Sequence, residues 1–253
     1  MPALEIQKSA LYDLLASGVV DFLDLGSGAG QSYEYVRRTT GLKVGVSLDT
    51  IPEKVTECRQ VNDLSFVYDI REVPYSFGAV NAAFMLNVLQ QIASEKSALQ
   101  VVQNALVASR DYVVIRQPYF DHDAALAELG FRSYWGDWST HLCRMDLPFL
   151  AGLARRCGPF AERLRVFGID RIADSQSPFI LPLTAPPEQD RYNEARHGAK
   201  AEVAFDFASY REVMVIIERQ SMSEAGAAAI ARMLGGLGKR ITLLEEVGQP
   251  VAA

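Results

Sequence analysis

A glycine-rich loop between an apolar run and a helical pattern places the strongest constraint on how this chain folds. The run Val19–Leu25 is short and almost entirely apolar, and glycines follow it at positions 26, 28 and 30. Helical spacing of apolar residues then extends over Gln31–Thr40. Short apolar runs ended by glycine are typical of strands that are buried on both faces of a parallel sheet. The order of strand, glycine loop and helix therefore predicts an α/β fold.

The same alternation of strand and helix continues along the chain. Further strands are predicted at 43–48, 65–68, 79–86, 111–117, 163–169 and 211–218. Helices are predicted at 3–17, 52–60, 94–109, 123–129 and 146–157. Alternation at this spacing predicts a doubly wound, mostly parallel, seven-stranded sheet. Ligands of such sheets bind at the carboxyl ends of the strands.

The regular pattern weakens after Pro118, and the stretch from about 118 to 211 is too irregular for an independent domain. We therefore expect residues 1–253 to form a single domain that carries insertions at 118–162 and 171–211. The tail 222–253 is predicted as a C-terminal extension with an Ala-rich helix, a glycine break and a short apolar strand.

Composition narrows the possible partners and the compartment. The chain has 253 residues, a hydrophobic content of 49% and a net charge of −6, which disfavours binding to the nucleic-acid backbone. Three scattered cysteines are too few for a disulfide framework. The sequence has neither a signal-peptide pattern nor an apolar run of about 18 residues, so we expect a cytoplasmic protein without a membrane span. A homo-oligomer is compatible with these features.

The loop from Asp24 to Gly30, Asp-Leu-Gly-Ser-Gly-Ala-Gly, resembles motif I of the class I, Rossmann-like methyltransferases that use S-adenosyl-L-methionine. An acid stands two positions before the first glycine, and Gln31 occupies the place of the third glycine in the dinucleotide pattern. The alternative is a tight strand-to-helix turn without a ligand. The resemblance implies S-adenosyl-L-methionine as cofactor and a methyltransferase-type fold. It also implies that the donor-binding residues of this loop are Asp24, Gly26, Ser27, Gly28 and Gly30.

Later strand ends extend the resemblance. In the family, an acid after the second strand binds the ribose hydroxyls. Its commonest position falls on Ser47 here, so we assign the role to Asp49, whose alternative is a turn acid or helix cap. Asp69 matches the acid that binds the adenine amino group, with a solvated loop acid as its alternative. Leu86 and Asn87 are expected to lie between the donor and the acceptor.

The region after the fifth strand contains the candidates for acceptor binding. His141 is the candidate base or acceptor-binding residue, and its alternative is a structural histidine. Tyr134, Trp135 and Trp138 are predicted to wall an acceptor pocket, unless they form a small separate core. Tyr119 is a further candidate, although Gln-Pro-Tyr-Phe differs from the amino-methylating Asn/Asp-Pro-Pro-Tyr/Phe motif. No regular spacing of metal ligands occurs, so no metal site is predicted.

Three functions follow from these patterns. The leading hypothesis is a methyltransferase acting on a small-molecule or glycan acceptor at oxygen, since the chain is acidic and its insertions are compact. The first alternative is an NAD(P)-dependent oxidoreductase, which the missing third glycine and the absence of a Tyr-x-x-x-Lys motif disfavour. The second is a catalytically silent methyltransferase-like subunit that binds a partner, because Ser47 and Gly78 replace acids that are usual in the family.

Overall fold

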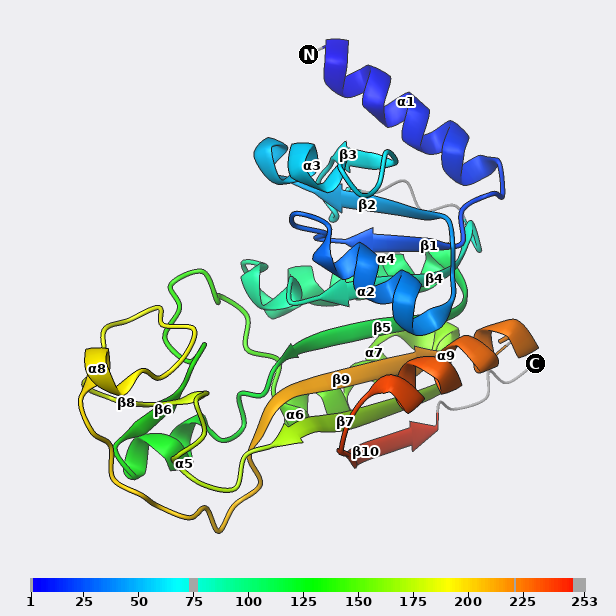
Figure 1. The fold of residues 1–253 in the computed structure, drawn as a ribbon. Helices are drawn as coiled ribbons and strands as arrows, with labels where there is room; N and C mark the ends of the chain where they lie inside the picture. Colours follow the sequence, from blue (N-terminus) through cyan, green and yellow to red (C-terminus); the bar gives the residue numbers. More distant parts are fainter. Residues whose placement is uncertain (1, 73–76, 221, 248–253) are drawn as a thin grey trace.

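A computed structural model describes residues 2–72, 77–220 and 222–247, and its centre is one large twisted sheet (Figure 1). Within the described residues the strand order is β3-β2-β1-β4-β5-β9-β7-β10. Strands β1 to β5 are parallel, β9 is antiparallel to β5, β7 to β9 and β10 to β7. The strand bounds are β1 Phe22–Leu25, β2 Gly45–Asp49, β3 Ser65–Val67, β4 Val80–Leu86, β5 Ser109–Pro118, β7 Arg163–Arg171, β9 Tyr210–Glu218 and β10 Arg240–Val247.

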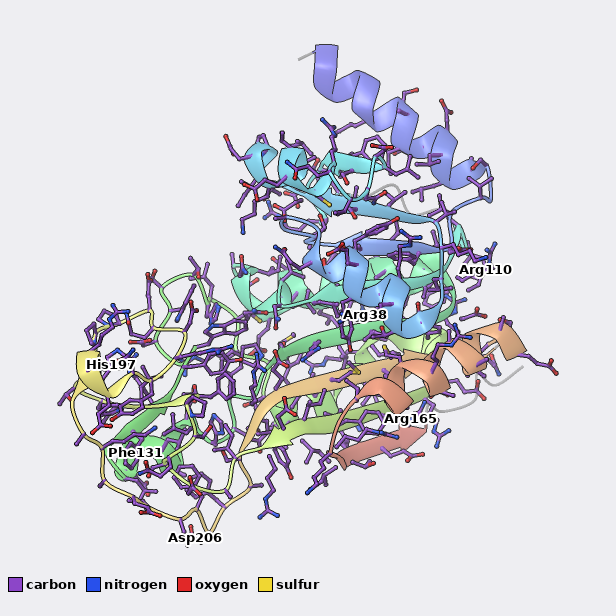
Figure 2. The ribbon with its side chains drawn as sticks, viewed as in Figure 1. Arg38, Arg110, Phe131, Arg165, His197 and Asp206 are labelled. Carbon is purple, nitrogen blue, oxygen red and sulfur yellow. The ribbon has the colours of Figure 1, made fainter. Side chains whose placement is uncertain are left out.

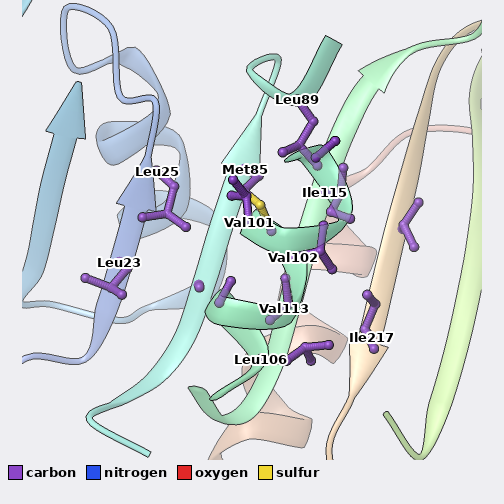
Figure 3. Packing of buried hydrophobic residues seen from close by; sticks show 14 of the residues in the cluster. Leu23, Leu25, Met85, Leu89, Val101, Val102, Leu106, Val113, Ile115 and Ile217 are labelled. Carbon is purple, nitrogen blue, oxygen red and sulfur yellow. The ribbon is translucent and has the colours of Figure 1, made fainter. Parts of the chain in front are cut away.

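Helices cover both faces of this sheet, because its strands are apolar on both sides. On β4, Ala83 and Met85 join the core under α4, whereas Ala82 and Phe84 join the core under α2 and α9. Figure 3 shows α4 lying over β4 and β5 with Val101, Val102 and Leu106 inserted between helix and strands. The helix bounds are α1 Pro2–Ala16, α2 Gln31–Thr40, α3 Pro52–Cys58, α4 Glu95–Ala108, α5 Asp123–Glu128, α6 Leu147–Ala151, α7 Leu153–Arg156, α8 Glu194–His197 and α9 Glu224–Gly236.

Parts of the inserted segments before and after β7, with α5, β6, β8 and α8, gather into a lobe beyond the end of β5 and the start of β9 (Figure 1). Helices α6 and α7 pack on the main sheet instead. The centre of the lobe is a two-stranded antiparallel ribbon of β6 Phe131–Ser133 and β8 Ile180–Pro182. A small core of its own, with Leu126, Phe131 and Ile180, supports the ribbon. In Figure 2 the labelled Phe131 and Asp206 lie in this lobe, far from Arg110 at the opposite end of the sheet.

The predicted α/β class and doubly wound sheet are confirmed. The described main sheet has eight strands, because β10 from the C-terminal extension adds an edge strand to the seven that the sequence predicts. The helix predicted at 146–157 is interrupted at Gly152, which separates α6 from α7. The first strand begins at Phe22, and Val19 is exposed in the preceding loop. No helix among the described residues is long and apolar enough to cross a membrane.

Candidate functional site

A cavity of about 670 Å³ opens at the edge of the sheet where the parallel strands end. Its size lies within the range of small-molecule sites. The lining comes from the loops after β1, β2, β3 and β4, from the end of β5 and from the start of β9. Of the residues predicted for donor binding, those that line it are Gly26, Ser27, Gly28, Asp49, Asp69, Leu86 and Asn87.

The glycine loop turns tightly at the end of β1. The N–H groups of Gly26 and Ser27 donate to the carbonyl of Leu48, 2.8 and 3.0 Å away, so the loop is attached to the end of β2. Gly26 has a φ of 76°, and an added Cβ would meet the Val88 side chain at 2.3 Å. Gly28 also has a positive φ, 54°, but an added Cβ there would meet no atom within 4 Å. Gly28 therefore leaves open space on the cavity wall, where a ligand can approach the backbone.

Two other predicted loop residues, Asp24 and Gly30, are not among the lining residues. Gly30 precedes α2 and packs on the end of α3 and the turn after it, since a Cβ would meet Cys58 Sγ at 3.2 Å and Val61 at 2.6 Å. Asp24 is fully buried on β1 and accepts a hydrogen bond from the Ser32 hydroxyl at 2.7 Å. Burial raises the pKa of Asp24 to about 7, although the Ser32 hydrogen bond opposes this shift. Both residues support the loop from behind.

Asp49 is the last residue of β2 and links that strand to the glycine loop. Its Oδ2 accepts the Gly28 N–H at 2.9 Å, and its Oδ1 accepts the Ile51 N–H at 3.0 Å. Ser47, which occupies the commoner family position, is fully buried within the strand and accepts a hydrogen bond from the Asn62 side chain at 2.9 Å. At the end of β2, the carboxylate on the cavity wall is therefore that of Asp49.

Asp69 follows β3 and lies at the same edge as Asp49. Its Oδ1 accepts the backbone N–H and the Nε of Arg71, both at 2.9 Å. The Arg71 hydrogen bond, which is stronger than the opposing effect of burial, holds the pKa of Asp69 below its usual range. Asp69 is therefore ionised near neutral pH and fixed in orientation, with Arg71 beside it on the cavity wall.

Asn87 lies directly after β4, where the cavity passes from the glycine loop toward β5. It has a φ of 59°, which is uncommon for a residue with a side chain. Its side-chain Oδ1 is buried and has no hydrogen-bond partner among the residues that the structure describes. Leaving a buried acceptor unpaired costs free energy, so this oxygen is suited to receive an N–H or O–H group from a ligand.

The far end of the cavity contains residues that the sequence reasoning missed: Tyr35, Arg116, Arg211 and Glu212. Glu212 is almost completely buried and accepts Arg116 Nε at 2.8 Å, with a second bond from Arg116 Nη2. The Arg116 guanidinium lies over the Tyr35 ring, 5.4 Å from its centroid. The signal that could have located Arg211 and Glu212 is the direction of their strand relative to β5. Because β9 runs antiparallel to β5, its first residues lie where β5 ends.

The predicted acceptor-site aromatics lie in the lobe and do not line the cavity. The rings of Tyr134, Trp135, Trp138 and His141 pack against one another, with centroid separations of 4.8 to 6.2 Å. His141 Nδ1 lies 3.1 Å from the Trp135 carbonyl oxygen, and burial lowers its pKa. Tyr119 is buried in the main core against Tyr210. These five assignments stay predictions.

Comparison with known proteins gives the fold a wider setting. No family model matches the chain, and no curated protein matches its sequence. Among solved structures, it is similar to an S-adenosylmethionine-dependent methyltransferase from Archaeoglobus fulgidus, with a TM-score of 0.52 and 12% identity over 85% of this chain and 94% of that one. It is also similar to a candidate methyltransferase from Bacillus halodurans, with a TM-score of 0.51 and 12% identity over 85% of this chain and 100% of that one. Likeness at such low identity concerns the fold.

Proposed function

Taking the class I, Rossmann-like methyltransferase fold of this chain as the premise, we propose that it is an enzyme that transfers a methyl group from S-adenosyl-L-methionine to a small-molecule or glycan acceptor. The observation that carries the proposal is the direct bond between the glycine loop and the acid of β2. Asp49 Oδ2 accepts the Gly28 N–H at 2.9 Å on the wall of the cavity. The backbone at Gly28, which a ligand can approach because no Cβ is present, thus lies next to a carboxylate that can accept hydrogen bonds from two ribose hydroxyls.

The residues of the cavity wall fit the parts of this donor. Asp49 has lone pairs left for ribose hydroxyls after it has accepted two N–H groups. Asp69, fixed by Arg71, would accept the adenine amino group. The unpaired Oδ1 of Asn87 would accept from the ammonium group of the methionine part. Gly28 would let the donor lie against the backbone, Gly26 makes room for Val88 at the turn, and Asp24 packs behind the loop.

Catalysis would depend mainly on alignment. S-adenosyl-L-methionine would supply an electrophilic methyl group for transfer to the acceptor oxygen, and its sulfur would keep the electron pair of the broken bond. The acceptor hydroxyl would give its proton to the base. The wall beside Leu86 and Asn87 would hold the two reactants in line. His141 stays the proposed base, because burial lowers its pKa and leaves a neutral imidazole near pH 7.

A base role for His141 is open to a direct test. His141→Ala should lower kcat by about 100-fold, within the range for general-base catalysis, with unchanged S-adenosylhomocysteine affinity. An unchanged kcat would assign His141 to the packing of the aromatic lobe.

We also place the protein in the cytoplasm, since Cys58, Cys143 and Cys157 are free and buried.

Calorimetry with S-adenosylmethionine, S-adenosylhomocysteine and NADH tests the proposed donor. We expect binding of the first two ligands and no response to NADH. Binding of NADH without S-adenosylhomocysteine would instead favour the oxidoreductase alternative. A screen for S-adenosylhomocysteine release over metabolite and glycan extracts tests turnover. Donor binding without any turnover would favour the silent-subunit alternative.

A further inference from the structure

The cavity extends past the proposed donor-binding loops to strands β5 and β9. Its lining spans all six neighbouring strands from β3 to β9. At about 4.8 Å between strands, this corresponds to about 24 Å along the edge of the sheet. Asp49 and Asp69 lie at one end, and Arg116, Arg211 and Glu212 lie at the other. A donor whose adenosine is held by the two acids leaves the arginine end for the acceptor.

The charges at the arginine end do not cancel. Arg116 and Glu212 form a buried ion pair, with 19% and 3% of their side chains exposed, and neutralise each other. Arg211 adds a second guanidinium to the same wall. Its ion-pair partner Asp170 is 3.9 Å away, is half exposed and does not line the cavity. The arginine end therefore has a net positive charge.

Arg211 is held in a fixed position but has unused donor capacity. Its guanidinium carbon lies 4.3 Å from the centroid of the Phe179 ring and 5.9 Å from that of Tyr134. Its Nε is buried and has no hydrogen-bond partner in the described part of the chain. Stacking on a ring restrains the planar guanidinium and leaves its edge free for a carboxylate or phosphate. A carboxylate or phosphate oxygen at that edge would accept a hydrogen bond from the unpaired Nε.

We propose that the acceptor of this enzyme is an anion, carrying a carboxylate or phosphate group that Arg211 holds at the β9 end of the cavity. The inference rests on the proposed methyltransferase function and names the class of its acceptor. Arg211 would fix the anionic group while the rest of the acceptor extends along the cavity toward Asn87 and the donor methyl group. The opposite charges of the anionic acceptor and the sulfonium donor would favour their simultaneous binding.

The test uses the full chain saturated with S-adenosylhomocysteine. It is titrated with matched acids and neutral amides: salicylate and salicylamide, mandelate and mandelamide, glucuronate and glucuronamide. Glycerol phosphate separates phosphate from carboxylate recognition, and glucosamine represents a cationic ligand. We expect at least one anion of the set to bind about tenfold or more tightly than the neutral compounds, the size of effect of one charge-assisted hydrogen bond. Binding of no anion above the amides, or preferential binding of glucosamine, overturns the proposal.

Substitution then assigns the preference to one side chain. Arg211→Gln should abolish the preference for the anion and leave the S-adenosylhomocysteine affinity within about twofold. Arg191→Gln is the matched control, because Arg191 also lies over Phe179, at 5.8 Å, but does not line the cavity. The control should keep the preference. A loss of S-adenosylhomocysteine affinity in Arg211→Gln would mean that Arg211 holds the donor, which overturns the proposal without affecting the proposed function. Failure of the wild-type chain to bind S-adenosylhomocysteine would refute the proposed function itself.

Discussion

The two ends of the cavity are built in different ways. At the β1–β2–β3 end, the wall residues lie at the ends of their strands, in the loops that follow or in the first turns of the next helices, and backbone N–H groups of the glycine loop bond to the end of β2. At the β5–β9 end, the wall depends on an ion pair between residues 96 positions apart, Arg116 and Glu212. The first end is local and rich in glycine and acids. The second is assembled by tertiary pairing and contains arginines. The proposed donor side is thus built from local sequence, and the proposed acceptor side is built by tertiary pairing.

The largest expected effect concerns the β5–β9 end of the cavity, which tertiary pairing assembles. Arg116→Met leaves the carboxylate of Glu212 buried without its partner, so we expect the free energy of unfolding to fall by about 3–5 kcal/mol. Urea denaturation measures this loss. The double variant Arg116→Met/Glu212→Leu should recover most of it, because no unpaired charge remains. As a control, Arg163→Met breaks a pair with Glu245 that is 42% and 43% exposed, and should cost less than about 1 kcal/mol.

A second effect concerns Asp24, which packs behind the glycine loop, and is seen in how the free energy of unfolding depends on pH. Because burial raises the pKa of Asp24 from 3.8 to about 7, the folded chain keeps a proton that the unfolded chain loses between these values. The free energy of unfolding therefore falls as pH rises across this window, by about 4 kcal/mol in total from this group. Asp24→Asn should remove this contribution and be more stable than wild type at pH 8. Equal slopes of stability against pH in the two proteins would contradict the assignment.

A third effect concerns the donor. Asp49→Ala removes the acceptor of the Gly28 and Ile51 N–H groups together with the proposed ribose carboxylate. We expect the S-adenosylhomocysteine affinity to fall by about 100-fold, since two hydrogen bonds to a charged group are lost. The control is Asp21→Ala, because Asp21 Oδ2 also accepts two backbone N–H groups, from Lys43 and Val44, but does not line the cavity. Equal affinities in the two variants would refute the role of Asp49.

The smallest effect probes the open space beside Gly28. Gly28→Ala places a methyl group where no atom lies within 4 Å, on the wall of the cavity. We expect an affinity loss of about tenfold for S-adenosylhomocysteine, and a stability loss of about 1–2 kcal/mol from the positive φ. Gly18→Ala is the control, since Gly18 also has a positive φ and open surroundings but does not line the cavity. Gly18→Ala should lower the stability and leave the S-adenosylhomocysteine affinity unchanged. Thermal unfolding measures the first quantity and calorimetry the second.

The same contrast explains what the sequence could predict. The parallel strands and the site residues at the ends of β1, β2, β3 and β4 follow from local patterns, because a parallel strand presents its carboxyl end at the binding edge. Arg211 and Glu212 were missed because their place depends on the direction of β9, which periodicity does not encode. The β6–β8 ribbon was missed since its short strands pair across a long insertion. The aromatic residues of the lobe pack on one another and do not line this cavity, and their role in acceptor binding stays a prediction.

A crystal structure of the chain with S-adenosylhomocysteine tests the division of the cavity most directly. We predict that the ribose hydroxyls bond to Asp49, that the adenine lies beside Asp69, and that the amino group of the homocysteine part lies within hydrogen-bonding distance of Asn87 Oδ1. The Arg211 guanidinium should then remain free of the ligand. A ligand bound outside this cavity, or one whose carboxylate is held by Arg211, would contradict the account.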